Sequence, residues 1–321
     1  MSAREIAMPA PAKTAATAGD RTRAIPPGPA PELLSKRYRI ERLLGVGGMG
    51  AVYRARDLLR EQFGDPQPWI ALKTLNDSFA EYPDANALLY SEFALTSRLH
   101  HAHVVQLHGF HTDSRCQRAY ITMELLKGPT LDELISANPD GMPWAQLQEI
   151  AVALLQALAY AHARGVLHGD LKPSNVMIAE DGLRLFDFGL GQAIGDLLPG
   201  LPRLSRARIA AWTPRYAALE LLEGQPLAAA ADVYAVACVL YELSSGHHPF
   251  SRMTARQAKN MQQDKSLERP RHLPLHCWPA LRQALAFDQQ QRIDARGLLE
   301  AFSAPPPSLL QRLFTRQQHI P

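Results

Sequence analysis

The sequence predicts an α+β protein of two unequal lobes, in which a small antiparallel β-sheet lobe with one helix precedes a larger, mainly helical lobe. Up to about residue 126 most segments have the pattern of short strands, whereas after Gly128 apolar residues recur with helical periodicity. The chain has 321 residues, 46% of them hydrophobic, which is enough for two closely packed lobes. We expect the lobes to be joined near Glu124–Gly128.

The small lobe is expected to cover residues 36–126. Its first two strands flank a glycine cluster. The connection that follows them, residues 58–68, is expected to be a loop, because it is longer than a hairpin needs and Gly64, Pro66 and Pro68 interrupt it. The expected strands and helix of this lobe are, in order, strands at Tyr38–Leu44, Ala51–Asp57 and Trp69–Leu75, an amphipathic helix at Asn86–Leu99 and a strand at Tyr120–Leu125.

The large lobe is expected to cover residues 127–303, with helices at Leu131–Ser136, Trp144–Ala163 and Asp232–Ser245. Residues 1–35 are rich in proline and alanine with few large apolar residues, which predicts a disordered tail. A second tail, residues 304–321, begins at a run of three prolines. Its apolar residues could form one short helix that either docks on its own domain or binds a partner.

Composition limits the classes of function. The formal net charge of +3 gives no strong field for nucleic acid or an anionic membrane, so we expect neither as a partner. No secretory signal opens the chain and no run of about 20 apolar residues occurs, which predicts a soluble protein without membrane insertion. The three cysteines, Cys116, Cys238 and Cys277, lie far apart, as expected of free thiols in a reducing cytoplasm.

The most informative motif is His168-Gly169-Asp170-Leu171-Lys172-Pro173-Ser174-Asn175, followed by Asp187-Phe188-Gly189. The two stretches place two carboxylates, a lysine and an asparagine amide at short, fixed spacing. Phosphoryl transfer needs such a set, because one carboxylate positions the attacking hydroxyl while the other, with an amide, holds magnesium. The lysine can offset charge on the moving phosphoryl group. Each tripeptide alone is a weak signal, but their order and spacing together indicate this chemistry.

A glycine cluster between the first two strands suits phosphate binding. Glycines let the main chain approach phosphates closely and point amide groups at them. A Rossmann loop would require a helix directly after the glycines, but here Val52-Tyr53-Arg54-Ala55 continues as a strand. A purely structural glycine turn is the remaining alternative. The cluster contains Gly45, Val46, Gly47, Gly48 and Gly50.

Lys73 ends the otherwise apolar run Ile70-Ala71-Leu72-Lys73. A lysine at a strand edge is usually a solvated charge. Within this pattern Lys73 is expected to reach the first two phosphates of a nucleotide, and it then needs a carboxylate to hold it. Glu92 on the following helix is the preferred partner, and Glu81, which precedes that helix, is second.

Taken together, these motifs resemble a bacterial eukaryotic-like (Hanks-type) Ser/Thr protein kinase, over about Tyr38–Phe302. The resemblance implies a bilobal protein-kinase fold and an ATP-dependent protein serine/threonine kinase that also phosphorylates itself and serves signalling. Further segments in family order are Tyr120-Ile121-Thr122-Met123-Glu124, Thr213-Pro214-Arg215-Tyr216 with Glu220, Asp232-Val233-Tyr234, and Arg292.

The resemblance also assigns roles. Asp170 would orient the substrate hydroxyl and accept its proton, and Lys172 would lie against the phosphoryl group. Lys73 and Glu92 would form the ion pair of an assembled site. Thr213 matches a threonine that steadies the catalytic aspartate and lysine and suggests a Ser/Thr acceptor. Asn175 and Asp187 would bind Mg²⁺, for which Mn²⁺ could substitute. Around ATP, Val52 and Ala71 would cover the adenine, Met123 would sit behind it, and backbone groups of Glu124 and Leu126 would bond its edge.

Other matches are structural. By the same resemblance, Asp232 ties down the catalytic loop, and Glu220 with Arg292 anchors the end of the activation segment. His168 is expected to pack and hydrogen-bond in the core. Leu219 stands where the family usually has proline, which puts the local turn in doubt but not the chemistry.

Gly169 departs from the family pattern, because many regulated kinases have arginine there. Without that charge, a phosphate on the activation segment loses one partner. Ser205 is the only hydroxyl residue between Leu190 and Trp212, although Arg203, Arg206 and Arg208 surround it. We therefore hypothesise that activity does not depend on phosphorylation of this segment.

Two other functions remain open. A small-molecule phosphotransferase is one, since Leu167-His168-Gly169-Asp170 also resembles aminoglycoside and choline kinases. A pseudokinase scaffold is the other, although its mark would be a missing Lys73, Asp170, Asn175 or Asp187. The resemblance implies protein substrates with Ser/Thr acceptors and, for relatives of this soluble kind, a forkhead-associated protein and a cognate phosphatase. The histidines His100, His101, His103, His108 and His111 are expected to pack or lie on the surface, with a metal site as the alternative.

Overall fold

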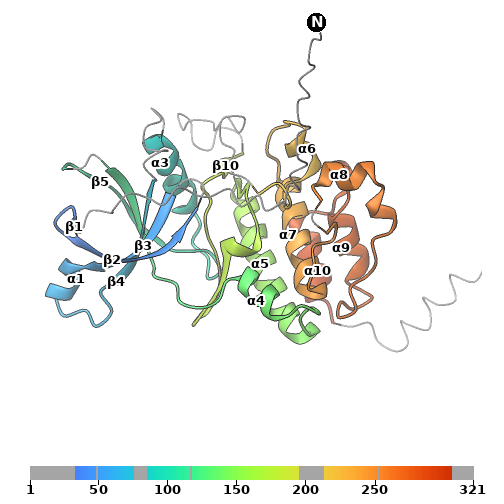
Figure 1. The fold of residues 1–321 in the computed structure, drawn as a ribbon, viewed down its shortest axis with the longest axis horizontal. Helices are drawn as coiled ribbons and strands as arrows, with labels where there is room; N and C mark the ends of the chain where they lie inside the picture. The colour runs from blue at the N-terminus through green and yellow to red at the C-terminus, as the bar shows by residue number, and fades with distance from the viewer. Residues whose placement is uncertain are drawn as a thin grey trace, which may run out of the picture.

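The computed structural model describes residues 33–47, 50–75, 85–115, 118–194, 213–251 and 253–305. Strands gather at one end of the molecule and helices at the other, as the sequence predicts (Figure 1). The strand-rich part forms the beginning of the chain and the helical part its second half.

The small lobe is a six-stranded antiparallel sheet in the order β1-β2-β3-β4-β6-β5. In β3 the residues alternate between the buried face of Tyr53 and Ala55 and the more open face of Val52 and Arg54, which is the period-two pattern of a strand. The strands are β1 (Leu33–Leu34), β2 (Tyr38–Val46), β3 (Gly50–Asp57), β4 (Trp69–Leu75), β5 (Leu107–Asp113) and β6 (Arg118–Met123).

Each face of this sheet has its own apolar cluster. Ile70, Leu72 and Tyr120 belong to one cluster, whereas Leu75 and Ile121 belong to the other, which packs against helix α3 (Ala85–Thr96). Because side chains alternate along β4, Lys73 emerges on the face that α3 covers.

The described structure already includes residues 33–35, just before the expected start of the small lobe near Lys36. Leu33–Leu34 pairs with β2, and Leu34 is fully buried. The Tyr120 hydroxyl donates to Ser35 Oγ over 2.7 Å, and the Ser35 amide donates to the Asp113 carboxylate. These partners are distant in the sequence, and they order a segment whose composition alone predicts disorder.

The expected loop at 58–68 also contains an unpredicted helix, α1 (Leu58–Gln62). The carboxylate of Asp57, the last residue of β3, accepts a hydrogen bond from the Leu59 amide at 3.1 Å and so caps the helix. The Arg37 guanidinium donates to both oxygens of the same carboxylate. Only the second half of the connection, which contains Pro66 and Pro68, is a loop.

The large lobe is mainly helical, and α7 (Ala229–Ser245) runs through its core with almost every residue buried. The helix α5 (Trp144–Ala163) packs beside it and against α10 (Ala295–Ser303), where Trp144 meets Phe302. The other α-helices are α4 (Leu131–Ala137), α6 (Leu219–Leu222), α8 (Ala255–Asn260) and α9 (Trp278–Ala284), and the 3-10 helices are η1 (Pro173–Asn175), η3 (Gln263–Lys265) and η4 (Gln289–Gln291).

Two short strand pairs lie where the lobes meet: β7 (Val166–Leu167) with β10 (Gln192–Ala193), and β8 (Val176–Ala179) with β9 (Gly182–Leu185). The second pair follows the His168–Asn175 loop, where the motif predicts a strand pair. The Val105 amide donates to the Leu185 carbonyl over 3.0 Å, and this contact ties the small lobe to β9. Within the described ranges, none of the helices combines the length and the apolar character that crossing a bilayer requires.

Candidate active site

A cavity of about 390 Å³ lies between the two lobes. Ligand pockets for small molecules typically begin at about this size. Of the predicted site residues, Thr213 lies just outside its lining and Gly48 lies outside the described residues. The cavity is lined by the predicted Gly45, Val46, Gly47, Gly50, Val52, Ala71, Lys73, Glu92, Met123, Glu124, Leu126, Asp170, Lys172, Asn175 and Asp187, among others.

The glycine-rich end of the cavity is a β-hairpin, as predicted, with no helix after the glycines. The Gly47 amide donates to the Gly50 carbonyl over 2.8 Å, and β3 continues from Gly50 without interruption. A Cβ atom on Gly50 would lie 2.0 Å from the Thr74 carbonyl oxygen, so only glycine fits there. The hairpin therefore holds its main chain along the cavity wall.

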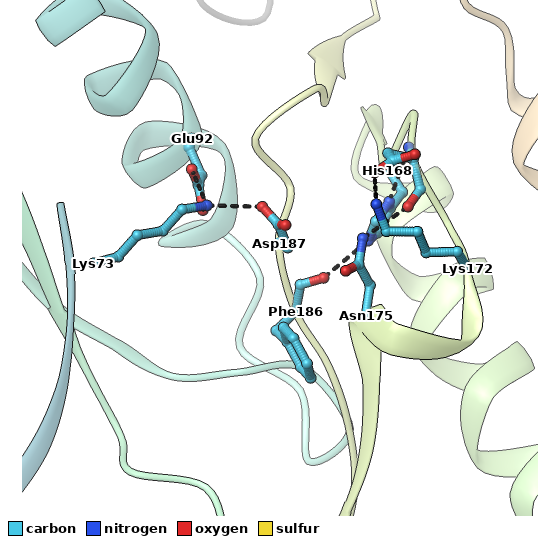
Figure 2. Close-up of polar contacts among 8 residues, drawn as sticks. Lys73, Glu92, His168, Lys172, Asn175, Phe186 and Asp187 are labelled. Carbon is cyan, nitrogen blue, oxygen red and sulfur yellow. Dashed lines mark hydrogen bonds and ion pairs between the residues drawn. The ribbon is translucent and has the colours of Figure 1, made fainter. Parts of the chain in front are cut away.

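Lys73 joins two carboxylates at the back of the cavity (Figure 2). Its Nζ donates to Glu92 Oε1 and Oε2 at 2.6 and 2.7 Å and to Asp187 Oδ1 at 2.7 Å. Glu92 comes from the buried face of α3, so the choice of Glu92 over Glu81 is consistent with the geometry. Three segments far apart in the sequence thus meet at one ammonium group.

Burial and charge act against each other in this cluster. Burial by itself would lower the pKa of Lys73, but Asp187 and Glu92 outweigh it and raise the pKa above its usual value. Burial also acts to raise the pKa of Asp187, yet Lys73 holds it at about 2. For Glu92, burial prevails over the attraction of Lys73 and raises the pKa. The lysine and Asp187 are therefore both charged near neutral pH.

One buried carboxylate fixes the main chain of the loop that follows β7. Asp232, near the start of α7, accepts the amide protons of His168 and Gly169 at 2.8 Å each. Burial opposes ionisation of Asp232, but hydrogen bonds and charge, first from His162, lower its pKa. Gly169 has φ +82°, a left-handed conformation that glycine adopts at little cost.

His168 is fully buried, as predicted. Its Nε2 lies 3.1 Å from the Phe186 carbonyl oxygen, and its ring packs against Phe188 with 4.6 Å between centroids. The Asp170 amide donates to Nδ1 at 3.2 Å. The histidine therefore positions the loop from inside the core.

Asp170, Lys172 and Thr213 form the second charged group at the cavity. Lys172 Nζ donates to Asp170 Oδ2 at 2.5 Å and to Thr213 Oγ1 at 3.2 Å, and the Thr213 amide donates to Asp170 Oδ1 at 3.3 Å. Burial raises the pKa of Asp170 despite the opposing effect of Lys172. The three predicted residues thus meet although Thr213 is distant in the sequence.

Asn175 and Asp187 offer oxygen ligands of the kind that Mg²⁺ takes. Asn175 Nδ2 donates to the Asp170 carbonyl at 2.8 Å, which fixes the amide and leaves its oxygen as an acceptor. The Asp187 side chain is 38% exposed, and no hydrogen bond to its Oδ2 is found among the described residues. Two protein oxygens suit a magnesium ion that also binds substrate phosphates and water, so the residues fit this metal.

The adenine end of the cavity has fewer free backbone hydrogen-bonding groups than the sequence predicts. The Glu124 amide already donates to the Gln106 carbonyl at 3.0 Å, so the Glu124 carbonyl is its remaining backbone group for a base. The Glu124 carboxylate accepts from the Gln106 amide and from Arg184 Nε, which ties the link between the lobes to β9. Arg184 was not among the predicted residues, and no local signal in the sequence marks it.

Several lining residues were not predicted. Met177 follows Asn175 by two positions in β8, on the strand that closes the cavity, and this proximity to the motif could have indicated it. Thr96 at the end of α3 carries no such signal. In full, the unpredicted part of the lining is Leu44, Thr96, Val105, Leu107, Leu125, Thr130, Ser174, Met177, Phe186 and Leu190.

The anchoring contacts beyond the cavity are in place. Arg292 donates to both oxygens of Glu220, at 2.5 and 2.8 Å. Leu219, which replaces the usual proline, is buried at the start of α6. Ser205, Glu81 and Cys116 lie outside the described residues, so the predictions about them stay predictions.

His101, His103 and His111 of the histidine cluster make packing or hydrogen-bond contacts. The His111 ring stacks on Tyr120 with 5.1 Å between centroids, and His101 lies 4.7 Å from Tyr160. His103 Nδ1 lies 3.2 Å from the Leu183 carbonyl oxygen.

Comparisons with known proteins agree with this geometry. The family described as "Protein kinase domain" matches residues 38–302. A probable serine/threonine-protein kinase of Streptomyces coelicolor is 34% identical over 68% of this chain and 32% of its own length. The serine/threonine-protein kinase PkaA of the same organism is 31% identical over 83% of this chain and 49% of its own length. The chain thus spans a third to a half of the length of these curated relatives.

The fold has solved counterparts. The crystal structure of the PknI kinase domain of Mycobacterium tuberculosis aligns with a TM-score of 0.61 and 25% identity, over 84% of this chain and 96% of that one.

Proposed function

Because the chain belongs to the protein kinase family, we propose that it transfers the γ-phosphoryl group of ATP to Ser or Thr hydroxyls of protein substrates, including its own. One observation carries the proposal: Lys73, Asp170, Asn175 and Asp187, which are remote in the sequence, all line one cavity between the lobes. A pseudokinase that lost a catalytic group would not retain this complete set. We further propose that residues 36–126 form the nucleotide-binding lobe and residues 127–303 the catalytic lobe.

In this proposal the small lobe binds the nucleotide. Val52 and Ala71 cover the adenine, and Met123 closes the space behind it. The glycine-rich hairpin directs main-chain amides at the phosphates. Lys73, charged and held by Glu92, reaches the first two phosphates and stabilises their charge.

The large lobe positions the acceptor. Asp170 orients the hydroxyl and accepts its proton, and its raised pKa suits that task better than an ordinary carboxylate would. Lys172 offsets charge on the phosphoryl group, while Thr213 fixes both side chains. Asn175 and Asp187 would hold Mg²⁺, or Mn²⁺ in its place, which supplies neutralising charge to the phosphates.

The segment after the catalytic loop supports a polypeptide acceptor over a small molecule. Residues Thr213–Glu220 pack on the large lobe, where Glu220 pairs with buried Arg292. The Tyr216 hydroxyl donates to Glu242 at 2.6 Å. Such a rigid segment beside Asp170 gives an extended peptide a surface to lie on, which a site for an aminoglycoside or choline does not need.

We propose that the site needs no phosphate on the activation segment. Lys73 already contacts both Glu92 and Asp187, and Gly169 places no charge beside Asp170 that a phosphate would neutralise. A cytoplasmic location, a signalling role, a forkhead-associated partner and a cognate phosphatase are further parts of the proposal that rest on the family resemblance.

The experiment uses the full chain, labelled ATP and Mg²⁺, with an acidic and a basic generic protein as acceptors. An Asp170→Asn variant is the control. Label on protein that the variant does not produce supports the proposal. Label only on added aminoglycoside or choline would favour the small-molecule activity, and no label with any acceptor would favour a scaffold.

A further inference from the structure

Arg215 lies at the border of the candidate acceptor site. The Tyr216 amide donates to the Thr213 carbonyl at 3.1 Å, which closes a four-residue turn with Pro214 and Arg215 at its centre. Thr213, at the start of this turn, contacts Asp170. The Arg215 side chain therefore leaves the main chain at the corner of a turn, two residues from a contact of the proposed catalytic carboxylate.

The main chain that carries Arg215 is firmly held. The Tyr216 hydroxyl is bound to Glu242, and the Tyr216 ring packs edge-on against buried His248 with 5.3 Å between centroids. Ala217 and Ala218 are buried directly after it. The turn is thus rigid, and only the outer part of the arginine side chain is free to reorient.

Among the described residues, the Arg215 guanidinium has only weak partners, one of them the Tyr216 ring, whose centroid lies 5.8 Å away. The Arg215 side chain is 41% exposed, and its nearest acid is Glu242, whose Oε1 lies 3.6 Å from one terminal nitrogen. That distance is too long for a good hydrogen bond, and the other Glu242 oxygen already accepts from Tyr216. Nε is buried without a hydrogen-bond partner among the described residues.

A guanidinium has five N–H donors in a planar fork that matches a carboxylate. Glu220, the other charged residue of the segment Thr213–Glu220, is neutralised by Arg292. Within the part of the chain that the structure describes, Arg215 is therefore the one charge of this segment whose donors lack full partners, two residues from Thr213, which contacts Asp170.

We propose that Arg215 is a specificity-determining residue, which favours polypeptide substrates that carry an Asp or Glu close to the acceptor Ser or Thr. This inference rests on the proposed kinase function. A carboxylate of the bound peptide would accept from the exposed terminal nitrogens of Arg215, which Glu242 does not reach at good hydrogen-bond distance, and a Lys or Arg at the same place would be repelled.

The test compares three sets of synthetic peptides that share one acceptor residue and differ only in Glu, Ala or Lys at the flanking positions. The full chain and its Arg215→Gln and Arg215→Glu variants are assayed with each set. We expect the wild type to prefer the Glu set over the Lys set in kcat/KM by about fivefold, the upper range for a partly exposed ion pair. Arg215→Gln is expected to abolish the preference and Arg215→Glu to invert it.

An inversion by Arg215→Glu supports a direct contact, because a merely structural role would lower all three sets alike. If the preference persists in both variants, or the wild type phosphorylates all sets equally, the inference is wrong while the kinase function stands. If the wild type transfers phosphate to no peptide or protein, the proposed function itself fails. If Arg215→Gln and Ser205→Ala both lower kcat/KM equally for all three peptide sets, the guanidinium binds a phosphate on Ser205 and not the substrate. That result also overturns the inference.

Discussion

Two buried ion pairs, one in each lobe, use the same charges in different ways. In the large lobe the Arg292 side chain is 0% exposed and all five of its N–H donors are used. It donates to Glu220 twice and to the carbonyls of Ala230, Ala286 and Phe287. In the small lobe Lys73 is also buried, but Asp187 on its far side is 38% exposed and faces the cavity.

The difference separates an anchor from a binding site. A buried charge whose partners are complete has no capacity for a ligand, and its contribution is to hold the chain together. The cluster around Lys73 is incomplete on its cavity side, since Asp187 keeps one carboxylate oxygen without a hydrogen bond among the described residues. Loss of the first pair should therefore affect stability, and loss of the second should affect phosphate transfer.

The strongest test of the anchor is Arg292→Met. This change leaves Glu220 buried without a counter-charge, which costs about 3–5 kcal/mol of unfolding free energy. Chemical denaturation measures the loss. A double variant with Glu220→Leu should recover part of it, because no unpaired charge then remains. A single variant as stable as the wild type would show that the pair is not an anchor.

Lys73→Met should affect phosphoryl transfer more than stability, unlike Arg292→Met. We expect the rate of phosphate transfer to fall by about 10²–10³-fold, as when one electrostatic contact to the transition state is removed. The protein should lose less stability than with Arg292→Met, because Glu92, whose pKa is already raised, can take up a proton. Initial rates with labelled ATP and thermal melts measure the two effects, with Lys259→Met on an exposed face as control. Equal loss of stability in both variants would contradict the distinction.

Acid should weaken the cluster at Lys73. Burial opposes ionisation of Asp187, but Lys73 lowers the pKa of this carboxyl from its ordinary value to about 2 in the folded protein. Its ionised form therefore stabilises the fold above the unfolded pKa, and this contribution is lost as the pH falls from about 5 towards 2. With allowance for its exposure, we expect about 1 kcal/mol.

Urea denaturation between pH 5 and pH 3 tests this expectation, with Asp187→Asn as the comparison. The wild type should lose more stability over this range than the variant. Parallel pH profiles would show that Asp187 has no depressed pKa.

The smallest effect is expected from Ser205→Ala. If the cluster at Lys73 assembles without a phosphate, the substitution should change the rate of phosphoryl transfer by less than about twofold. The reason is that Gly169 has no positive charge with which a phosphate on Ser205 could pair. The measurement is the initial rate on a protein acceptor. Loss of activity in a protein that still melts like the wild type would refute the hypothesis.

The strands and helices that the sequence predicts are those whose signal is local. Trp69–Leu75 and Trp144–Ala163 have the predicted bounds, because an apolar strand and an amphipathic helix are visible in a short window. β1 and α1 are not visible in this way. The first depends on Tyr120 and Asp113, and the second on a capping carboxylate that belongs to the preceding strand.

By itself, the sequence determined the kinds of chemical group at the site and their order, because the spacing within His168–Asn175 and Asp187–Gly189 needs no fold to be recognised. Tertiary structure alone decided that Lys73 meets Asp187 and Asp170 meets Thr213, because those contacts span 114 and 43 residues. Among the described residues, it also gives Arg215 too few acceptors for its donors, whereas every donor of Arg292 has one. Both are arginines in the sequence, and only the number of acceptors that folding places around each guanidinium tells them apart.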